Sequence, residues 1–447
     1  MHSVNTAIDV AQDDIGASAV ERKTKLDAIY RKVALRLIPF LFIIFVVAWI
    51  DRVNVGFTKL QMNESLGFSE TVYGLGAGIF FVGYFLFEVP SNLVLQRFGA
   101  RLTISRIAIG WGLACIVMAF VTTSTGFYVM RFIIGAFEAG LWPGLVLYLT
   151  YWFPTTRSAK AFALISCGSS ASGIIGGPLA GLIMDHMSGL QGWAGWRWVF
   201  LLEGIPSVLL GIVAIWLLSD RPQEARWLTD DERRLLIEDL AQDRKQVGDR
   251  EHSFWRAFGT RQVWTFVLIY FCIIMGQSAM FFWAPTILKD LGFTTSTTIG
   301  MIISGIFCIA IVAVVLNGID SDRTKEVRFH CGLGVLAGAL GCVALSILLL
   351  QGSQWAILAL CVAIPGILCS VPVFWQLPNR VMVGTAAAAG LALINSIGNL
   401  GGFAAPFLMG VIKDATGHVT YALWLVAALL ALGAFLTMMQ PKTQKDA

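Results

Sequence analysis

The chain contains roughly twelve apolar runs, each long enough to cross a membrane and separated mostly by short polar or Gly- and Pro-bearing turns. Crossing the hydrocarbon layer takes about 20 apolar residues per helix. With 57% apolar and only 13% charged residues, the composition is also that of a membrane protein. The expected spans are residues 33–57, 72–92, 103–122, 127–150, 159–184, 197–219, 262–288, 297–318, 329–351, 355–378, 384–412 and 419–440.

The positions of Lys and Arg predict the orientation. If the amino terminus is cytoplasmic, 26 of the 32 basic residues fall in cytoplasmic segments, four fall outside and two fall within spans. Cytoplasmic loops carry such an excess. We therefore expect a multi-pass protein of the bacterial inner membrane with both termini in the cytoplasm. The excess of basic residues that gives the net charge of +4 is then explained by this orientation in the membrane, and nucleic-acid binding is not expected. The outside residues are Lys59, Arg197, Lys289 and Lys413.

Five segments follow from this pattern. The stretch before the first span lacks an apolar core and is expected to be a loose tail. In the polar middle segment, Thr229 precedes acidic residues and an apolar stripe, which predicts an N-capped amphipathic helix that tethers the two halves. The segments are an N-terminal tail (1–32), a six-helix bundle (33–219), a linker (220–261), a second six-helix bundle (262–440) and a C-terminal tail (441–447).

The two halves resemble each other. "GGPLAGLIMD" and "AAPFLMGVIKD" align at Pro178 and Pro406, an offset of 228 residues. The same offset carries Arg97 to Lys325, in an equivalent turn. A parallel repeat of six plus six spans indicates two pseudo-symmetric bundles that enclose a cavity and rock against each other. The fold class expected is an all-α membrane protein with twelve transmembrane helices, built for alternating access.

Four charged residues lie inside spans of the first half: Asp51, Arg52, Arg131 and Glu138. At a span centre each would cost roughly 2.5 to 3.5 kcal/mol if it faced lipid. We expect all four to face the interior. Shifted by the repeat offset, they fall on uncharged residues, so the ionic wall belongs to the first half only.

Arg131 and Glu138 are seven residues apart and share one helix face. A guanidinium can bind a carboxylate through two parallel hydrogen bonds. When an anionic substrate takes the arginine, a buried carboxylate loses its partner and takes up a proton, which gives a basis for symport. The alternative is a buried ion-pair set that only holds helices together.

The second half offers rings and amides instead of charges. The Tyr84 hydroxyl, in the first half, needs a polar partner within its span. Trp375 and Gln376 lie between Pro372 and Pro378, where we expect an irregular helix that lines the cavity. Asn395 and Asn399 lie one turn apart on a Gly-rich helix. The remaining candidates for this wall are Gln277, Phe281, Trp283 and Phe374.

Other polar residues have simpler interpretations. Glu88 and Glu203 are interpreted as structural or gating partners of loop arginines. Asp185 and Asp414 lie at outer turns, where solvation satisfies them. None of the five histidines is mid-span, and the cysteines have no metal-ligand spacing. Neither a catalytic nucleophile nor a phosphate-binding loop emerges, so we expect no enzyme, cofactor or metal.

Several motifs resemble the major facilitator superfamily, and within it the anion:cation symporter branch with its phthalate, tartrate, sugar-acid and hydroxyphenylacetate permeases. The resemblance covers nearly the whole chain. The motifs are "WIDRVNVGF" (49–57), "PSNLVLQRFGAR" (90–101), "RFIIGAFEAGLWPGLVLYLTYWFP" (131–154), "GWRWVFLLEGIP" (195–206), "FWQLP" (374–378) and "AAAAGLALINSIGNLGGFAAP" (386–406).

The resemblance implies twelve helices and proton-driven uptake of organic anions. It implies that Asp51 and Glu138 are protonation sites and that Arg52 and Arg131 bind the substrate carboxylate. Tyr84 and the two asparagines become supporting contacts. The turn at 90–101 matches the gating motif, although Gln96 stands where many members have Asp. The gating candidates in this turn and its equivalent are Arg97, Arg101, Asp322 and Arg323.

We therefore predict a monomeric symporter that imports a small organic carboxylate with protons. The acid could be aromatic, a dicarboxylate or a sugar acid. One rival is a proton-coupled antiporter that exports amphipathic compounds, although paired arginines disfavour cationic drugs. A membrane sensor is a second rival, but it should carry a sizeable cytoplasmic domain. The expected partners of the predicted symporter are the substrate anion, protons and membrane lipid.

Overall fold

The computed structural model describes residues 2–247, 261–382 and 386–441. Within these ranges the spans predicted from sequence appear as twelve candidate membrane helices. The first half contains α1 (His2–Val53), α2 (Val55–Leu66), α3 (Glu70–Phe98), α4 (Ala100–Met118), α5 (Ser124–Glu138), α6 (Leu141–Trp152), α7 (Thr155–Met187), η1 (Leu190–Gly192) and α8 (Gly195–Leu217). The linker contains η2 (Pro222–Glu224) and α9 (Asp230–Val247). The second half contains α11 (Arg261–Asp290), α12 (Ser296–Thr324), α13 (Val327–Leu350), α14 (Ala356–Val381), α15 (Ala386–Gly398), α16 (Gly401–Thr416) and α17 (Thr420–Met438).

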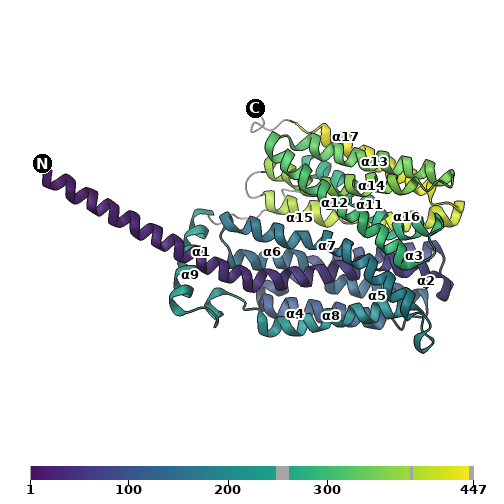
Figure 1. The fold of residues 1–447 in the computed structure, drawn as a ribbon, viewed down its shortest axis with the longest axis horizontal. Helices are drawn as coiled ribbons and strands as arrows, with labels where there is room; N and C mark the ends of the chain where they lie inside the picture. Colours follow the sequence, from purple (N-terminus) through teal and green to yellow (C-terminus); the bar gives the residue numbers. More distant parts are fainter. Residues whose placement is uncertain (1, 248–260, 383–385, 442–447) are drawn as a thin grey trace.

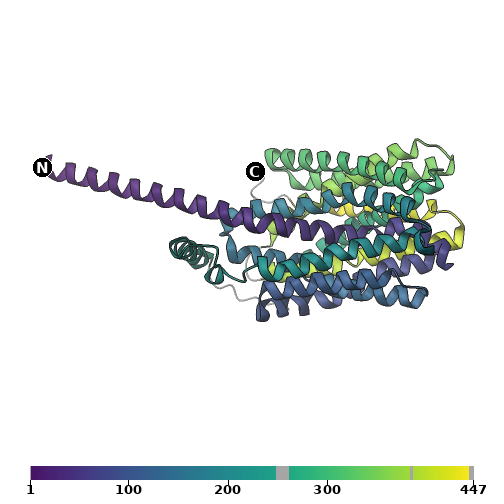
Figure 2. The same ribbon diagram turned by 60° about the horizontal axis from the view of Figure 1, so that its bottom comes forward.

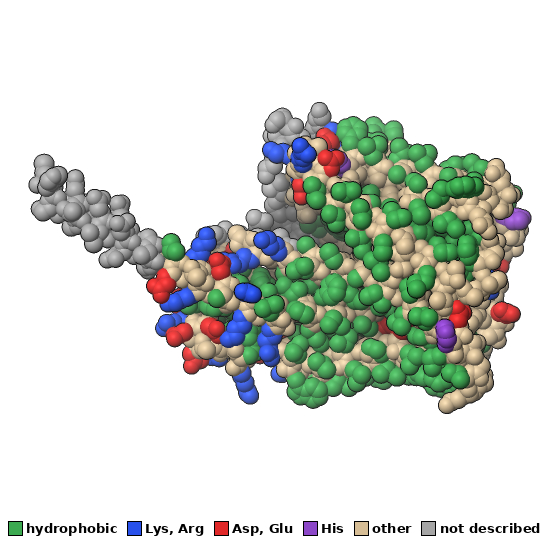
Figure 3. Space-filling model, in the orientation of Figure 1, with side chains coloured by type: hydrophobic (Ala, Val, Ile, Leu, Met, Phe, Trp, Pro, Cys, Tyr) green, Lys and Arg blue, Asp and Glu red, His purple; other side chains and the backbone are tan. Residues whose placement is uncertain are grey.

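The helices form two bundles that lie side by side with their axes roughly parallel (Figures 1 and 2). The end at which α1 leaves the first bundle and α17 ends is called here the terminal face, and the opposite end the far face. The two tail segments expected from sequence begin at the terminal face. Residues 248–260 of the linker and 442–447 of the C-terminal tail lie outside the described residues. The side of the molecule seen in Figure 3, between the two faces, is covered largely by hydrophobic side chains, as a lipid-facing surface must be.

The halves meet through two equivalent helix pairs, α3 with α16 and α7 with α12. Glycines allow the backbones to approach closely. A Cβ at Gly78 of α3 would lie 2.8 Å from the carbonyl oxygen of Phe403, and one at Gly177 of α7 would lie 3.0 Å from that of Gly300. Small residues favour such contacts between membrane helices, where no hydrophobic force drives association.

Three expected spans each consist of two helices. The break between α1 and α2 lies at Asn54, and α15 and α16 are separated by two residues. The break between α5 and α6 contains Gly140, whose φ is +84°. Glycine adopts this left-handed conformation without steric cost. The breaks matter because Arg52 and Glu138 stand immediately before two of them.

Two expectations about local structure are wrong. Pro372 and Pro378 do not interrupt their helix, because α14 continues through both. Proline is tolerated in membrane helices where neighbouring groups satisfy the freed backbone. The N-terminal stretch is helical rather than loose, since α1 begins at His2. Leu26, Ile29 and Val33 are buried, and their helical spacing forms an apolar stripe.

The linker helix α9 confirms the predicted N-cap. The Thr229 backbone N–H donates to Glu232 Oε2 at 2.9 Å, and the Glu232 N–H donates to Thr229 Oγ1 at 3.3 Å. This reciprocal pair is a capping box. The helix lies across the terminal face, nearly perpendicular to the spans (Figures 1 and 2). It is tied to α1 by an ion pair of 2.7 Å between Lys32 and Glu232, and the Tyr30 hydroxyl donates to Asp239 at 2.6 Å.

Candidate functional site

An ion pair joins the ends of α1 and α5 inside the first bundle. Arg52 Nε donates to Glu138 Oε1 at 3.1 Å, and Arg52 Nη2 contacts the same oxygen. Glu138 is only 2% exposed, and its Oε2 atom has no hydrogen-bond partner among the residues that the structure describes. The carboxylate therefore depends on Arg52 for its compensation. The helix α3 packs closely against α5 at Gly83 and Gly135, and this packing positions the rings of Phe80 and Tyr84 beside the ion pair.

Three aromatic rings surround the Arg52 guanidinium. Its central carbon lies 4.6 Å from the ring centroid of Trp49, 5.0 Å from that of Phe80 and 5.3 Å from that of Tyr84. Such cation–π contacts stabilise a partly desolvated cation while leaving its N–H donors available. Tyr84 thus contributes its ring to the site, as a neighbour of Arg52.

A small cavity between the halves reaches this guanidinium. Its volume is about 30 Å³, which is room for about two water molecules. Arg52 is the one charged residue among those that line it. An organic acid needs more space, so the halves must move apart to admit one. The lining residues are Trp49, Arg52, Val53, Phe81, Ile274, Gln277, Ser278, Phe281, Phe282 and Asn399.

Arg131 lies deeper than Arg52 and does not line the cavity. Its side chain is 0% exposed, and Nε and Nη2 each donate, at 3.4 Å, to the carbonyl oxygens of Gly76 and Ala77 respectively. Its central guanidinium carbon lies 4.9 Å from the centroid of Phe80, the ring that Arg52 also contacts. Within the described part of the chain, Arg131 Nη1 has no hydrogen-bond partner. Of the two arginines expected to bind the substrate carboxylate, Arg52 thus reaches the cavity, whereas Arg131 is buried behind it.

Asp51 points away from the cavity, into the core of the first bundle. It accepts hydrogen bonds from Trp111 Nε1 at 2.7 Å and from Ser207 Oγ at 2.8 Å. Ser207 also contacts the backbone carbonyl of Glu203. Sequence reasoning missed Trp111 and Ser207, because each lies on another helix. The only available signal was a hydroxyl one turn after Glu203 within an apolar run.

Glu88 joins the halves instead of pairing with a loop arginine, so that expectation is wrong. Its two carboxylate oxygens accept from Asn395 Nδ2 at 2.9 Å and from Ser396 Oγ at 3.0 Å. Asn399 donates to Asn395 at 3.2 Å. Glu203 is likewise buried, and its Oε1 atom has no hydrogen-bond partner. Single-sequence analysis cannot recognise such amide partners from a distant helix.

The remaining residues of the second wall lie away from the cavity. The ring of Trp375 contacts that of Tyr270, with centroids 4.9 Å apart. Gln376 Nε2 is 3.5 Å from Asp322 Oδ1 near the terminal face. Trp283 is fully buried beside Lys59. The wall that faces Arg52 comes mainly from α11, with Asn399.

The proposed gating turns lie at the terminal face. The Arg101 backbone N–H donates to Asp220 Oδ1 at 2.7 Å, so a residue after α8 caps the start of α4. The Arg97 guanidinium lies over the ring of Phe98, 5.4 Å from its centroid. Asp322 and Arg323 are exposed in the equivalent turn.

Two aspartates form hydrogen bonds from one half to the other at the far face. Asp185, at the end of α7, accepts from the backbone N–H groups of Ser296 and Thr297 at 3.1 and 2.7 Å. Asp414, at the end of α16, accepts from those of Glu70 and Thr71 at 3.1 and 2.7 Å. Each half thus caps a helix of the other. Both aspartates are exposed, as expected at outer turns, but the sequence did not predict these hydrogen bonds between the halves. Both terminate the repeated motifs aligned at Pro178 and Pro406, which was the missed signal.

A lysine cluster reinforces this closure. Lys59 Nζ lies 2.6 Å from Glu70 and 3.5 Å from the ring centroid of Trp283. Lys413 bridges Glu70 and Asp290, with both N–O distances 3.2 Å. These contacts connect α2 and α3 of the first half to α11 and α16 of the second. The far face is therefore closed in this structure by charged contacts between the halves.

Comparison with known proteins decides the family. The model of the Major Facilitator Superfamily matches residues 41–406, which include the cavity and most of both halves. The chain belongs to this superfamily. It is therefore a multi-pass membrane transporter, as the sequence predicted, and not an enzyme.

Three relatives of this transporter align over nearly their full lengths. The "Putative metabolite transport protein NicT" of Pseudomonas putida is 45% identical over 95% of this chain and 96% of its own. A "Putative tartrate transporter" of Agrobacterium vitis is 43% identical, covering 94% and 92%. The "Quinolone resistance transporter" of Acinetobacter baumannii is 35% identical, covering 92% and 94%.

Solved transporter structures share the fold. The crystal structure of a D-xylose-proton symporter superposes with a TM-score of 0.74 at 16% identity, covering 92% of this chain and 99% of that one. At this identity the similarity describes architecture alone.

Proposed function

We propose that this transporter imports a small organic carboxylate together with protons by alternating access. The observation that carries the proposal is the Arg52–Glu138 pair. Arg52 is the charged residue that lines the cavity, and Glu138 has no other hydrogen-bond partner in the ranges that the structure describes. A cationic substrate would be repelled by this arginine, and a neutral substrate would gain only a weaker hydrogen bond than an anion does. An anion would compete with Glu138 for it.

The coupling step follows from that competition. A substrate carboxylate that enters the cavity accepts hydrogen bonds from Arg52, and Glu138 is released from the guanidinium. A carboxylate left without a cation in a dry site is stabilised by binding a proton. Proton and anion therefore bind together. Asp51 is proposed as the second protonation site, held by Trp111 and Ser207.

The orientation belongs to the proposal. We propose that the protein lies in the inner membrane of a bacterium, with the terminal face and both termini on the cytoplasmic side. We also propose that it is a monomer. The gathering of Lys and Arg over α1 and α9 (Figure 3) supports this assignment through the positive-inside rule. The far face then closes the external side, and entry of substrate requires its opening.

The rings of the cavity suggest which acids fit. Trp49, Phe81, Phe281 and Phe282 present flat apolar faces, while Gln277, Ser278 and Asn399 offer hydrogen bonds. This combination favours an aromatic or compact hydroxylated acid, and two of the relatives carry names of metabolite and tartrate transporters. Proton-coupled export of amphipathic compounds is the second candidate, favoured by the name of the quinolone resistance relative.

The experiment uses purified protein in liposomes. A thermal-shift screen against organic acids identifies the ligand, since binding stabilises the folded state with the logarithm of saturation. Glu138→Gln should then abolish accumulation driven by a pH gradient but preserve exchange of labelled for unlabelled acid. Glu64→Gln, at an exposed position, is the matched control. Normal accumulation by Glu138→Gln would exclude the coupling role, and export down the opposite gradient would favour the second candidate.

A further inference from the structure

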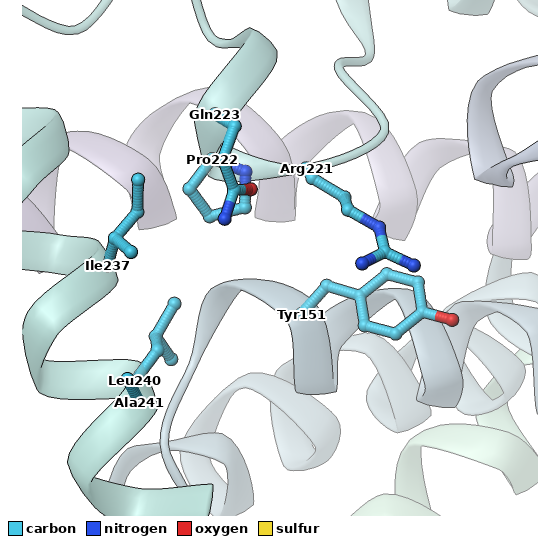
Figure 4. A pocket seen from close by; sticks show the side chains of 7 residues that line it. All are labelled: Tyr151, Arg221, Pro222, Gln223, Ile237, Leu240 and Ala241. Carbon is cyan, nitrogen blue, oxygen red and sulfur yellow. The ribbon is translucent and has the colours of Figure 1, made fainter.

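A second and larger cavity lies at the terminal face, outside the proposed transport path. Its volume is about 290 Å³. Figure 4 shows its side chains arranged around an open centre, with Arg221 and Tyr151 on one side and α9 on the other. It is mostly apolar, and Arg221 is the one charged residue that lines it. The lining residues are Tyr151, Arg221, Pro222, Gln223, Ile237, Leu240 and Ala241.

The cavity lies at the level where hydrocarbon gives way to headgroups. Tyr151 is one residue from the end of α6, and Arg221 follows α8 by four residues. Trp216, near the end of α8, is 75% exposed, as aromatic side chains are at a membrane interface. The helix α9 lies across this face, perpendicular to the spans (Figures 1 and 2). The apolar side of this helix, with Leu236 and Leu240, is buried against the protein.

The charges around the cavity favour an anion. Although α9 carries acidic residues, Glu232 and Glu238 pair with Lys32 and Arg22 of α1, at 2.7 and 3.7 Å. Asp239 accepts from the Tyr30 hydroxyl. These three acids are thus directed to α1, and among the described residues no carboxylate belongs to the lining of the cavity. The Arg221 guanidinium lies over the ring of Tyr151, 5.3 Å from its centroid, and is exposed.

We propose that this cavity binds one anionic phospholipid, with the phosphate on Arg221 and Gln223 and the start of an acyl chain between Tyr151 and the apolar side of α9. Basic pockets beside membrane helices recognise anionic headgroups in this way. The apolar lining from Ile237 and Leu240 distinguishes a lipid from free phosphate, which has no use for it. A bound lipid holds the linker helix against the first bundle.

The test measures lipid binding to the purified full-length protein. Phosphatidylglycerol, phosphatidylcholine and inorganic phosphate are titrated separately in detergent, with native mass spectrometry and the unfolding midpoint as readouts. Arg221→Gln removes the charge, and Ala241→Trp fills the apolar part. Arg226→Gln is the matched control, because Arg226 is an exposed linker arginine outside the lining. Unfolding without added lipid verifies that each variant folds.

We expect phosphatidylglycerol to be retained and to raise the unfolding midpoint of the wild type and of Arg226→Gln. Its affinity should fall at least about fivefold in Arg221→Gln, since one cation near an anionic surface contributes on that scale, and it should fall in Ala241→Trp as well. Equal binding of phosphatidylcholine would overturn the proposal. So would equal stabilisation by inorganic phosphate, or equal affinities of Arg221→Gln and Arg226→Gln.

Discussion

Arg52 donates a hydrogen bond from Nε to Glu138 Oε1 across 3.1 Å and so connects the last turn of α1 to the last turn of α5. Both helices end at or next to this pair, α1 at Val53 and α5 at Glu138. The pair therefore lies where the backbone can bend. Breaking the ion pair changes contacts at the ends of both helices. A site at this place can therefore couple substrate binding to helix movement.

Replacing Arg52 with Lys should weaken substrate binding roughly tenfold to a hundredfold, because hydrogen bonds to a charged group contribute about 1.5 to 3 kcal/mol. Lysine keeps the charge but loses the planar fork and its stacking on Trp49. Calorimetric titration with the acid found in the screen measures the change. Arg226→Lys in the linker should bind normally. Wild-type affinity in Arg52→Lys would show that the fork does not hold the substrate.

Replacing Arg131 with Gln should also weaken binding by at least about tenfold, if Arg131 turns to the cavity when the halves separate. Its unpartnered Nη1 atom is the donor available for that role. Affinity and unfolding midpoint are measured together on the same preparation. A lower midpoint with unchanged affinity would make Arg131 a structural residue that holds the carbonyls of Gly76 and Ala77.

The sequence predicted the spans, the repeat and the charged interior, because each rests on periodicity and on the cost of burying charge. It did not predict which of the charged side chains reach the cavity and which are buried away from it. Asp51 and Arg52 are neighbours, yet successive helix positions point about 100° apart, and only one reaches the cavity. Arg131 and Glu138 share a helix face, but the ring of Phe80 lies against Arg131. Which neighbour covers a side chain depends on helices distant in sequence.

The partners across the halves were also beyond single-sequence reasoning. Glu88 is satisfied by Asn395 and Ser396, about 300 residues away in the chain. An uncharged amide carries no signal that it faces a carboxylate. The aspartates of the far face were closer to detection, since both end a repeated motif. Their function depends on backbone N–H groups, which every residue except proline has.

Lowering the pH should loosen α9 from α1 through Glu232. The hydrogen bond from Lys32 holds the pKa of Glu232 below its ordinary value of 4.5. A group whose folded pKa is depressed stabilises the docked state fully above its unfolded pKa, and this contribution is lost as pH falls through the folded pKa. The loosening should therefore begin below about pH 4.5.

Hydrogen exchange of the α9 amides across pH 3 to 7 measures this docking. Glu232→Gln should exchange faster at neutral pH and change less between pH 5 and 3. Glu224→Gln, at an exposed position of the same linker, should behave as the wild type. An identical pH profile for Glu232→Gln would assign the docking to other contacts, such as that of Tyr30 with Asp239.

Removing the charges of Asp185 and Asp414 should favour opening of the far face. Each aspartate caps a helix of the opposite half with both carboxylate oxygens. Asn keeps one acceptor oxygen but loses the second oxygen and the charge, which together cost about 1 kcal/mol. One substitution to Asn should shift the equilibrium toward the open state roughly fivefold, and the double variant by the product of the two, because the sites are separate. Spin labels at the exposed positions Glu64 and Thr294, one on each half, report the separation. Asp320→Asn, at the terminal face, is the control for charge removal alone. If the label distances in the double variant match those of this control, the reciprocal caps do not hold the far face closed.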